Sequence, residues 1–297
     1  MPIESNATNP PTLPRRVLGR RLRELREVAG MSRANAARRC EMGAQTLWRL
    51  ETGRNSETKK IIVNALCDVY EASDTDRREL LWLVEESRKD GWWQSYADTM
   101  VPEVEMFIGL EQAASRSSTW QSTLVPGLLQ TPDYRQAVWE IGKAQRQQID
   151  LDRETELLAR RQERLHESDT FAFRAFICES ALRRRFCESD VMAGQLHRLI
   201  ELGGLPNVSV RVVPLAAPSH SGLINKDFVY LEFPAHPNPV LTETPVVYIE
   251  GFTGDLYLDK PVEISTYESA WSDIDRVALD ERETLSLIVG MRREFEA

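Results

Sequence analysis

The chain has 297 residues, of which 42% are hydrophobic and 28% are charged, and its formal net charge is −9. The length predicts two domains, and the composition is typical of a soluble globular protein. No apolar run is long enough to span a bilayer, and residues 1–16 lack the apolar stretch of a secretory signal. The four cysteines and four histidines are scattered, which argues against a disulfide framework or a metal site. We therefore expect a cytoplasmic protein with no membrane segment, metal or cofactor.

The charge is divided unevenly along the chain. Residues 1–60 contain 13 Lys and Arg against 6 Asp and Glu, whereas the remainder contains 24 against 40. A basic segment on an acidic body is typical of a DNA-facing module attached to another domain. The alternative is a chance excess of arginine on one solvated helix.

The first 90 residues are expected to form a helical bundle after a disordered segment, residues 1–14, which is rich in Pro, Asn and Thr. Residues 15–29 have apolar side chains at helical spacing, at Val17, Leu18, Leu22, Leu25 and Val28. Gly30 is expected to end this helix, and Ser32 to cap a second one that runs to about Arg39. A third helix follows the turn at 40–43. Helices are also predicted over 58–73, with an inward face of Ile61, Ile62, Ala65, Leu66 and Val69, and over 74–93, with Asp74 as the cap.

Residues 15–70 resemble an XRE-type helix-turn-helix of the phage-repressor-like class. The positions that carry the resemblance are Arg33, Ala37, Glu41, Leu47, Leu50, Glu51 and Gly53. Arg33 stands where the family usually has Gln, and Glu41 stands where it usually has the glycine of the turn. Glycine adopts a left-handed backbone at little cost and glutamate does not. Because Gly43 lies nearby, a reshaped turn is the alternative to a strained glutamate at this position.

This resemblance implies a recognition helix that enters the major groove of DNA near residue 44. Ala44, Gln45 and Thr46 would face base edges, with Gln45 bonding an adenine and the small apolar groups touching a thymine methyl. Arg49 would reach a guanine or a phosphate. Phosphate contacts are expected from Arg33, Arg54 and Lys59. The alternative is that Gln45 and Thr46 lie on an ordinary solvated helix and that Arg49 pairs within the bundle. Trp48 is expected at a bundle or dimer contact, or on the DNA backbone.

Residues 91–297 are expected to form a mixed α/β regulatory domain, so the fold class of the whole chain is α+β. Strands are predicted over 171–177, 207–214, 226–233, 245–251 and 255–259, with "GFTGD" as a hairpin connection. Helices are predicted over 178–186, 189–204, 262–280 and 281–297, the second of them capped by Ser189.

The same region resembles a domain of unknown function that follows XRE-type modules in actinobacterial antitoxin-like regulators. The segments that carry the resemblance are "GWWQSYAD", "FIGLEQAASR", "LVPGLLQTPDY", "PNVSVRVVP", "VVYIEG" and "LYLDKP", in this order. The resemblance implies a regulator that is often encoded beside a small partner protein. It supplies neither a ligand nor a reaction.

Candidate ligand or partner residues in this region are few. His220 precedes a predicted strand, and Tyr230, Tyr248 and Tyr257 lie on strands where, with Glu232, they would line a cavity; a surface histidine and packed tyrosines are the alternative. The bent stretch 124–134 is expected to be a rigid seam, with Pro132 at the first position of a helix. The tryptophans Trp92, Trp93 and Trp120 are expected to anchor the two domains to each other. Arg183–Arg185 form either a second basic patch or a solvated helix start.

Two classes of function follow. The first is a dimeric transcription factor, a repressor or autoregulator that binds double-stranded DNA and is controlled by a small-molecule effector or a partner protein. A homodimer is expected because one recognition helix buries little surface, and its half-sites would lie ~34 Å apart. The second is an antitoxin-like interaction protein that mainly binds a small partner. Because nucleophile elbows, P-loops, dinucleotide glycines and H-E-x-x-H are all missing from the sequence, we do not expect an enzyme.

Overall fold

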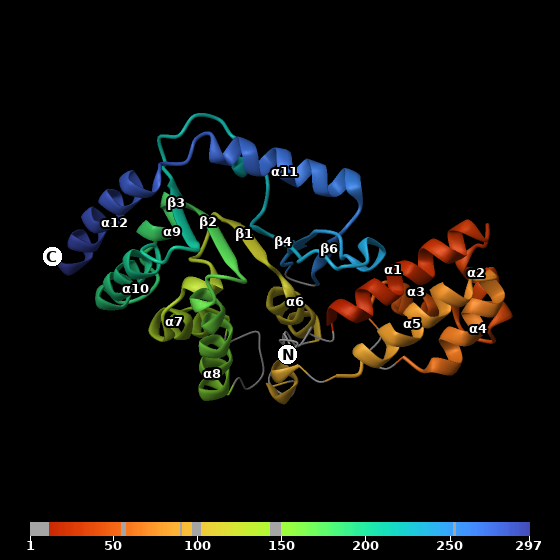
Figure 1. Cartoon of the computed structure of the whole chain (residues 1–297). Coiled ribbons are helices and arrows are strands. Elements are labelled where there is room, and N and C mark those ends of the chain that lie inside the picture. Colours follow the sequence, from red (N-terminus) through yellow and green to blue (C-terminus); the bar gives the residue numbers. More distant parts are fainter. Residues whose placement is uncertain (1–11, 55–57, 90, 97–101, 143–149, 252–253) are drawn as a thin grey trace, which may run out of the picture. The chain divides into compact units, whose positions relative to one another are not determined.

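The computed structural model describes residues 12–54, 58–89, 91–96, 102–142, 150–251 and 254–297. The chain forms two compact units, shown with their elements in Figure 1. The N-terminal unit comprises residues 1–97, 104–113 and 234–243. The C-terminal unit comprises residues 98–103, 114–233 and 244–297. The first unit therefore includes three stretches beyond the expected boundary at residue 90, namely 91–97, 104–113 and 234–243.

The N-terminal unit is all-helical. Its helices are α1 (Thr12–Val28), α2 (Arg33–Arg39), α3 (Ala44–Glu51), α4 (Lys60–Tyr70), α5 (Asp74–Glu86), η1 (Trp92–Tyr96), most of α6 (Pro102–Ala113) and η5 (Pro239–Leu241). The five helices expected before residue 90 are all present, and Figure 1 shows them gathered into one bundle. Its core includes Leu18, Leu22, Ala37, Leu47, Leu50, Val63, Leu66 and Leu80.

Details of the bundle differ from the sequence-based expectations. Residues 1–11 of the segment expected to be disordered lie outside the described residues, but residues 12–14 already belong to α1, where Leu13 is buried. A proline is tolerated there because the first helical N–H groups lack partners in any case. Ile61 is exposed, since α4 turns Val63 inward instead, whereas Leu66 is fully buried as expected. Residue Asp74 is not the cap of α5.

Short polar side chains cap the starts of α2 and α5. The Ser32 hydroxyl accepts the N–H of Asn35 at 3.2 Å, as expected. The Ser73 hydroxyl, one residue before Asp74, accepts the N–H of Asp76 at 3.1 Å. Serine can take this position because its side chain satisfies one of the free N–H groups of the first turn.

The C-terminal unit is built on a six-stranded mixed sheet. Its strands are β1 (Arg116–Gln121), β2 (Ala172–Cys178), β3 (Val208–Val213), β4 (Phe228–Glu232), β5 (Val246–Ile249) and β6 (Leu256–Leu258), in the spatial order β3-β2-β1-β4-β5-β6. The pairs β1–β2 and β2–β3 are parallel, and the remaining pairs are antiparallel. The five strands expected from the sequence are confirmed, and the chain is α+β. Residues 252 and 253 of the expected hairpin connection lie outside the described part.

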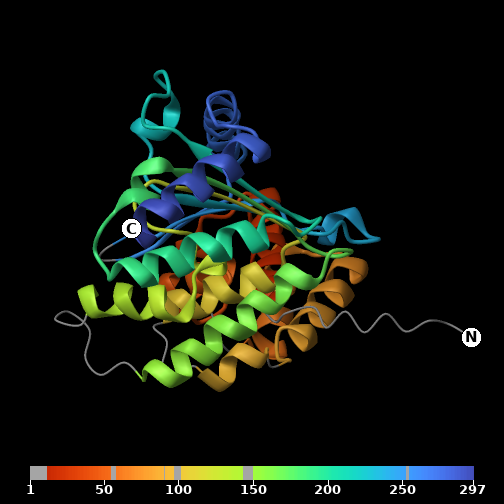
Figure 2. The same ribbon diagram turned by 90° about the vertical axis from the view of Figure 1, so that its left-hand side faces the viewer.

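Helices cover both faces of this sheet. They are α7 (Pro132–Gly142), α8 (Leu151–Gln162), α9 (Glu179–Arg183), α10 (Ser189–Leu202), α11 (Pro261–Asp275) and α12 (Glu281–Glu296), with short turns η2 (Gly127–Leu129), η3 (Glu163–His166) and η4 (Ser221–Leu223). Figure 1 shows α11 on one face and α7, α8 and α10 on the other. Figure 2 shows α10 and α12 running side by side. The N-cap of α10 is Glu188, so Ser189 is its first helical residue.

Strand β3 lies at one edge of the sheet, and this edge is covered by α12 and the residues that precede it. The N–H of Val212 donates to the Thr284 hydroxyl at 3.0 Å, and the N–H of Leu279 donates to the Val212 carbonyl at 2.9 Å. An uncovered edge strand would expose unpaired backbone groups to other chains.

The stretch 124–134 is a rigid connection from β1 to α7. Gln195, which is fully buried, donates to the Leu129 carbonyl at 2.8 Å and accepts the N–H of Thr131 at 2.7 Å. Pro132 is the first residue of α7, as expected. A buried amide that satisfies two backbone groups fixes the bend, because breaking it would leave them unpaired.

The tryptophans are not one set of anchors. Trp120 lies in β1 and packs in the core beneath α11 with Phe176 and Phe228, so it belongs wholly to the C-terminal unit. Trp93 is buried inside the N-terminal unit, and a Cβ at Gly109 of α6 would lie 3.1 Å from its ring. The periodic spacing of the sequence could not separate these two cores.

Candidate nucleic-acid interface

The turn between α2 and α3 keeps the left-handed residue that the motif requires. Glu41 has φ 53°, and it is followed by Met42, whose N–H donates to the Ala37 carbonyl at 2.9 Å. The N–H of Glu41 itself donates to the Arg38 carbonyl at 3.2 Å. These two bonds form a Schellman motif, which normally places glycine at the left-handed position. Gly43 has an ordinary extended backbone, so it does not reshape the turn.

Three other helices of the bundle end in the same way. Gly30 after α1 has φ 65°, Gly53 after α3 has φ 68°, and Glu71 after α4 has φ 55°. In each case the following N–H bonds the carbonyl five residues earlier. Two of these four left-handed positions are therefore occupied by glutamate, at a cost in backbone strain of about 1 kcal/mol each.

The two sides of α3 differ sharply in exposure. Leu47 is fully buried and Leu50 is 3% exposed, so this side is fixed in the bundle core. The opposite side carries four exposed residues, Ala44, Gln45, Thr46 and Arg49. These are the same four residues that are predicted from the sequence to face DNA. Three of them lie in the first turn of the helix, which is the part that reaches base edges in a helix-turn-helix.

The residues that are expected to bind DNA phosphates differ in their exposure and in the side chains that they already contact. Arg54 is exposed, and its guanidinium lies over the Trp48 ring, 5.2 Å from the centroid. Lys59 is exposed at the start of α4. Arg33, in contrast, directs its Nε at Glu51 Oε2 at 3.1 Å, and 39% of its side chain is exposed. Arg33 therefore joins α2 to α3 in addition to any contact with DNA.

Sequence reasoning missed two exposed basic residues at the end of α2. Arg38 and Arg39 are both exposed, and they precede the turn that leads to α3. Both arginines are visible in the "ARRC" stretch, but the family pattern places the phosphate contact of this helix at its start, at Arg33.

The carboxylate of Glu51 holds the three helices of the site together. It is buried, and it accepts Arg26 Nε from α1 at 2.6 Å in addition to Arg33 from α2. The hydrogen bonds that Arg26 donates to Glu51 raise the pKa of Arg26. Burial and then the charge of Glu51 raise the pKa of Tyr70. The exposed side of α3 thus rests on a fixed ionic support.

Of the candidate ligand residues of the C-terminal unit, Tyr248 and Tyr257 are brought together, with ring centroids 5.1 Å apart, but Tyr230 does not join them. In the β4–β5 register Tyr230 faces Val247, whereas Tyr248 faces Val229 and Tyr257. Because neighbouring residues of a strand point to opposite faces, Tyr230 lies on one face of the sheet and the other two tyrosines on the other. Tyr230 donates to Glu268 of α11 at 2.8 Å, and Tyr248 donates to Asp255 at 2.9 Å.

His220 stands at the start of η4, where its Nδ1 accepts the N–H of Gly222 at 3.1 Å and its ring meets Trp120 edge-on. Desolvation lowers the pKa of His220. Asp273 of α11 accepts the N–H and hydroxyl of Ser221, and its hydrogen bonds with Arg276 and Ser221 lower its pKa to about 2. These contacts fasten a loop to α11.

Two further candidate groups, Glu232 and Arg183, form ion pairs within the C-terminal unit. Arg116 Nη1 donates to both carboxylate oxygens of Glu232 across the β1–β4 pair, at 3.2 and 3.1 Å. Arg183 pairs with Glu179 and with Glu294 of α12, and the Arg185 guanidinium lies over the Phe295 ring, 5.1 Å from its centroid. Within the described residues, no group of three or more His, Cys, Asp or Glu side chains could hold a metal ion.

Two family models match the chain. A helix-turn-helix domain matches residues 17–80, which run from within α1 to the middle of α5. A domain of unknown function, DUF5753, matches residues 104–289, more than half of the chain. The chain belongs to the DUF5753 family. No curated protein and no solved structure matches it.

The DUF5753 region thus follows a helix-turn-helix, as the sequence predicted for a regulator of this architecture. The helix-turn-helix indicates a DNA-binding regulator, since this fold presents a helix to the major groove. None of the described helices is both long enough and apolar enough to cross a bilayer.

Proposed function

We propose that the chain is a sequence-specific transcriptional regulator that binds double-stranded DNA as a homodimer and represses its own gene. The observation that carries this proposal is the division of α3, with Leu47 and Leu50 buried and Gln45, Thr46 and Arg49 exposed. The ion pairs of Glu51 with Arg26 and Arg33 hold α3 in the bundle while this side of the helix stays exposed. The proposal places the chain with DNA in the cytoplasm.

Each exposed residue of the recognition helix α3 has a chemical task in this proposal. The Gln45 amide bonds an adenine edge, because it offers a donor and an acceptor side by side. Ala44 and the Thr46 methyl group contact thymine methyl groups, and Arg49 bonds a guanine or a phosphate. Arg54 and Lys59 bind phosphates, and Arg33 does so beside its ion pair with Glu51.

Homodimerisation follows from the size of this surface. One short recognition helix buries less area than specific binding at nanomolar affinity requires. Two copies related by a two-fold axis would read a pseudo-palindrome whose half-sites lie ~34 Å apart. A small-molecule effector or a partner protein would bind the C-terminal unit. Such binding would shift the equilibrium between the DNA-bound and the DNA-free protein.

The test of the proposal compares single substitutions on α3 with a matched arginine on α5, outside the two helices α2 and α3. Gln45→Ala and Arg49→Ala are each expected to reduce discrimination between DNA from upstream of the gene and scrambled DNA by about 1–3 kcal/mol. The control is Arg78→Ala, because Arg78 is exposed on α5. Fluorescence anisotropy measures both affinities. Unchanged discrimination in the two folded α3 variants would refute base reading by α3.

A second function, antitoxin-like binding of a small partner protein encoded nearby, is favoured by exposed apolar side chains in the C-terminal unit. Leu223 is 68% and Ile224 is 88% exposed, next to the loop that His220 and Asp273 fasten. Co-purification of the chain with the product of a neighbouring small gene tests this function. We propose no catalytic activity, since Tyr230 lies on the opposite face of the sheet from Tyr248 and Tyr257, and the hydroxyls of Tyr230 and Tyr248 each donate to a carboxylate.

A further inference from the structure

A ten-residue segment between two strands of the C-terminal unit is part of the DNA-binding bundle. Residues 234–243, here called the β4–β5 segment, connect β4 to β5 in sequence but belong to the N-terminal unit. Leu241 is 8% exposed and packs in the core of the bundle. Asn238 Nδ2 donates to Glu79 Oε1 of α5 at 2.8 Å. The helix-turn-helix is therefore completed by residues about 150 positions beyond it.

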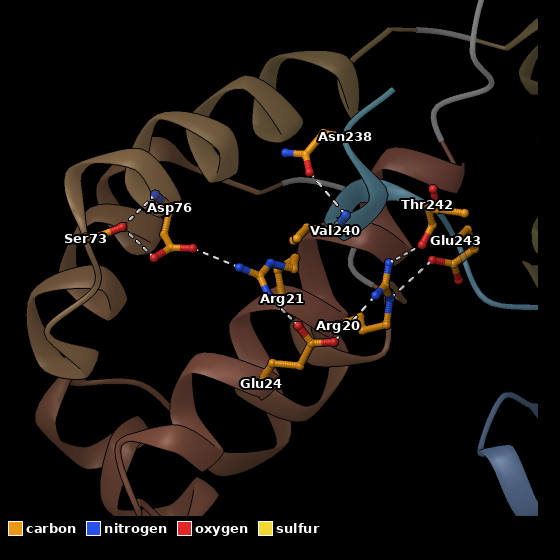
Figure 3. A network of polar contacts seen from close by, with 9 residues as sticks. All are labelled: Arg20, Arg21, Glu24, Ser73, Asp76, Asn238, Val240, Thr242 and Glu243. Atoms are coloured by element: carbon orange, nitrogen blue, oxygen red, sulfur yellow. Dashed lines mark hydrogen bonds and ion pairs between the residues drawn. The ribbon is translucent and has the colours of Figure 1, made fainter. Parts of the chain in front are cut away.

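The contact at the end of this segment is ionic and buried. The side chain of Glu243 is 1% exposed, and its Oε1 accepts Arg16 Nε from α1 at 2.9 Å. Arg20 Nε lies 3.6 Å from Glu243 Oε2, and Arg20 Nη2 donates to the Thr242 carbonyl at 2.7 Å. Figure 3 shows how Arg20 reaches both residues from α1. Such a pair is sensitive to the loss of either partner, because the remaining charge stays buried without compensation.

Arg16 also touches the end of the recognition helix. A Cβ at Gly53, the left-handed residue that ends α3, would lie 2.8 Å from Arg16 Cγ and 3.0 Å from Arg16 Cα. The side chain stem of Arg16 therefore lies directly against the backbone at Gly53, while its guanidinium faces Glu243. Two bonds that close α3 flank this point, from the N–H of Gly53 to Leu50 and from the N–H of Arg54 to Arg49.

We propose that Glu243 is a positioning residue for DNA recognition, which acts on the C-terminal end of α3 through Arg16. The β4–β5 segment holds Arg16 in place, and Arg16 holds Gly53 and the residues that follow it, Arg54 among them. A displacement of β4 or β5 then reaches the recognition helix through two side chains. The consequence for DNA rests on the proposed function, whereas the mechanical link between Glu243 and α3 does not.

Hydrogen exchange in the full chain without DNA tests the link. Glu243→Gln keeps the shape of the side chain but removes its charge. We expect the amides of residues 48–54 to exchange about tenfold faster than in the wild type, because local opening then costs less free energy. Amides of β2 and β3 in the C-terminal unit serve as an internal reference and are expected to keep their rates.

Two further variants separate this link from a general loss of stability. Glu24→Gln is the matched control, since Glu24 also pairs with Arg20 and Arg21 of α1 but is 38% exposed; it is expected to leave residues 48–54 unchanged. In the double variant Arg16→Met with Glu243→Gln, the apolar stem over Gly53 remains and no charge is left unpaired. We expect this variant to recover most of the protection lost in Glu243→Gln. Faster exchange confined to residues 234–243 in Glu243→Gln, or equal loss of protection in the double variant, would overturn the proposal.

A DNA measurement on the same variants keeps the two proposals apart. If the wild type discriminates upstream from scrambled DNA, Glu243→Gln is expected to lose part of that discrimination and the double variant to regain it. If the wild type does not discriminate, the proposed function fails, and the exchange result alone decides whether Glu243 positions α3.

Discussion

Arg26 and Glu51 form a buried, two-pronged ion pair that ties α1 to the last residue of the recognition helix. Arg26 Nε lies 2.6 Å from Glu51 Oε1, and Arg26 Nη2 donates to Glu51 Oε2 at 3.2 Å. The pair fixes the C-terminal end of α3, the helix whose exposed side we propose reads bases. Its integrity is therefore a condition for recognition as well as for folding.

The first prediction concerns this pair. Arg26→Met is expected to lower the free energy of unfolding by about 3–5 kcal/mol, because Glu51 then keeps only the half-exposed Arg33 as a partner. Adding Glu51→Gln to Arg26→Met should cost less than the sum of the two single changes. Urea unfolding followed by circular dichroism measures all three. Additive losses would mean that the two side chains do not stabilise each other.

The second prediction concerns the left-handed residue in the turn before α3. Glu41→Gly is expected to raise the free energy of unfolding by about 1 kcal/mol, since glycine adopts φ 53° without the clash of a Cβ. Glu71→Gly should do the same after α4, where φ is 55°. The matched control is Glu41→Ala, which removes the carboxylate but keeps the Cβ and should bring no such gain. A gain from alanine equal to that from glycine would show that charge, and not backbone strain, sets the effect.

The third prediction compares two glycines inside helices. Gly19 of α1 lies so close to α3 that a Cβ would overlap the Leu50 and Glu51 carbonyl oxygens, whereas a Cβ at Gly194 of α10 would meet nothing within 4 Å. Gly19→Ala is therefore expected to destabilise the bundle by about 1–3 kcal/mol through overpacking. Gly194→Ala should stabilise its helix by up to about 1 kcal/mol. Thermal unfolding that ranks the two variants in the opposite order would contradict the close approach of α1 and α3.

The fourth prediction concerns pH and His220. Desolvation lowers the pKa of His220 below its ordinary value of 6.5, and Nδ1 must stay unprotonated to accept the N–H of Gly222. As the pH falls through 6.5, the unfolded chain takes up a proton at this residue before the folded chain does, so stability is lost toward lower pH. Above pH 6.5 the contribution is fully present.

The variant His220→Asn isolates that contribution, because an asparagine oxygen can accept the same N–H but does not titrate. The free energy of unfolding of the wild type is expected to fall more between pH 7.5 and pH 5 than that of the variant. Parallel pH profiles for the two proteins would show that the protonation of His220 is not linked to folding.

The recognition helix could be predicted from the sequence because its evidence is local. Leu47 and Leu50 lie three residues apart, and the family pattern places Glu51 and Gly53 directly after them. The five strands with apolar alternation were found for the same reason. Strand β1 was missed because "RSSTWQ" has one large apolar residue, although Ser117, Ser118 and Thr119 are buried at the centre of the sheet. Hydroxyl side chains fit there by bonding the backbone, as Thr119 does with the Phe228 carbonyl at 3.0 Å.

Long-range partners lay beyond sequence reasoning. Nothing in the "HPNPVLTE" stretch indicates that Glu243 meets Arg16, since the two residues are 227 positions apart. The division of Tyr230 from Tyr248 depends on strand register, which alternation alone does not fix. Arg33 likewise looked like a free phosphate ligand because its partner, Glu51, lies on another helix.

The central claim is that α3 of this chain reads DNA, and the most direct measurement is the affinity of the full chain for DNA from upstream of its own gene. Fluorescence anisotropy would compare this DNA with a scrambled duplex over a series of salt concentrations. The account predicts at least about a thousandfold preference for the upstream DNA and an affinity that falls steeply with salt, since each released phosphate counterion contributes to the slope. Equal binding to both duplexes at every salt concentration would contradict it.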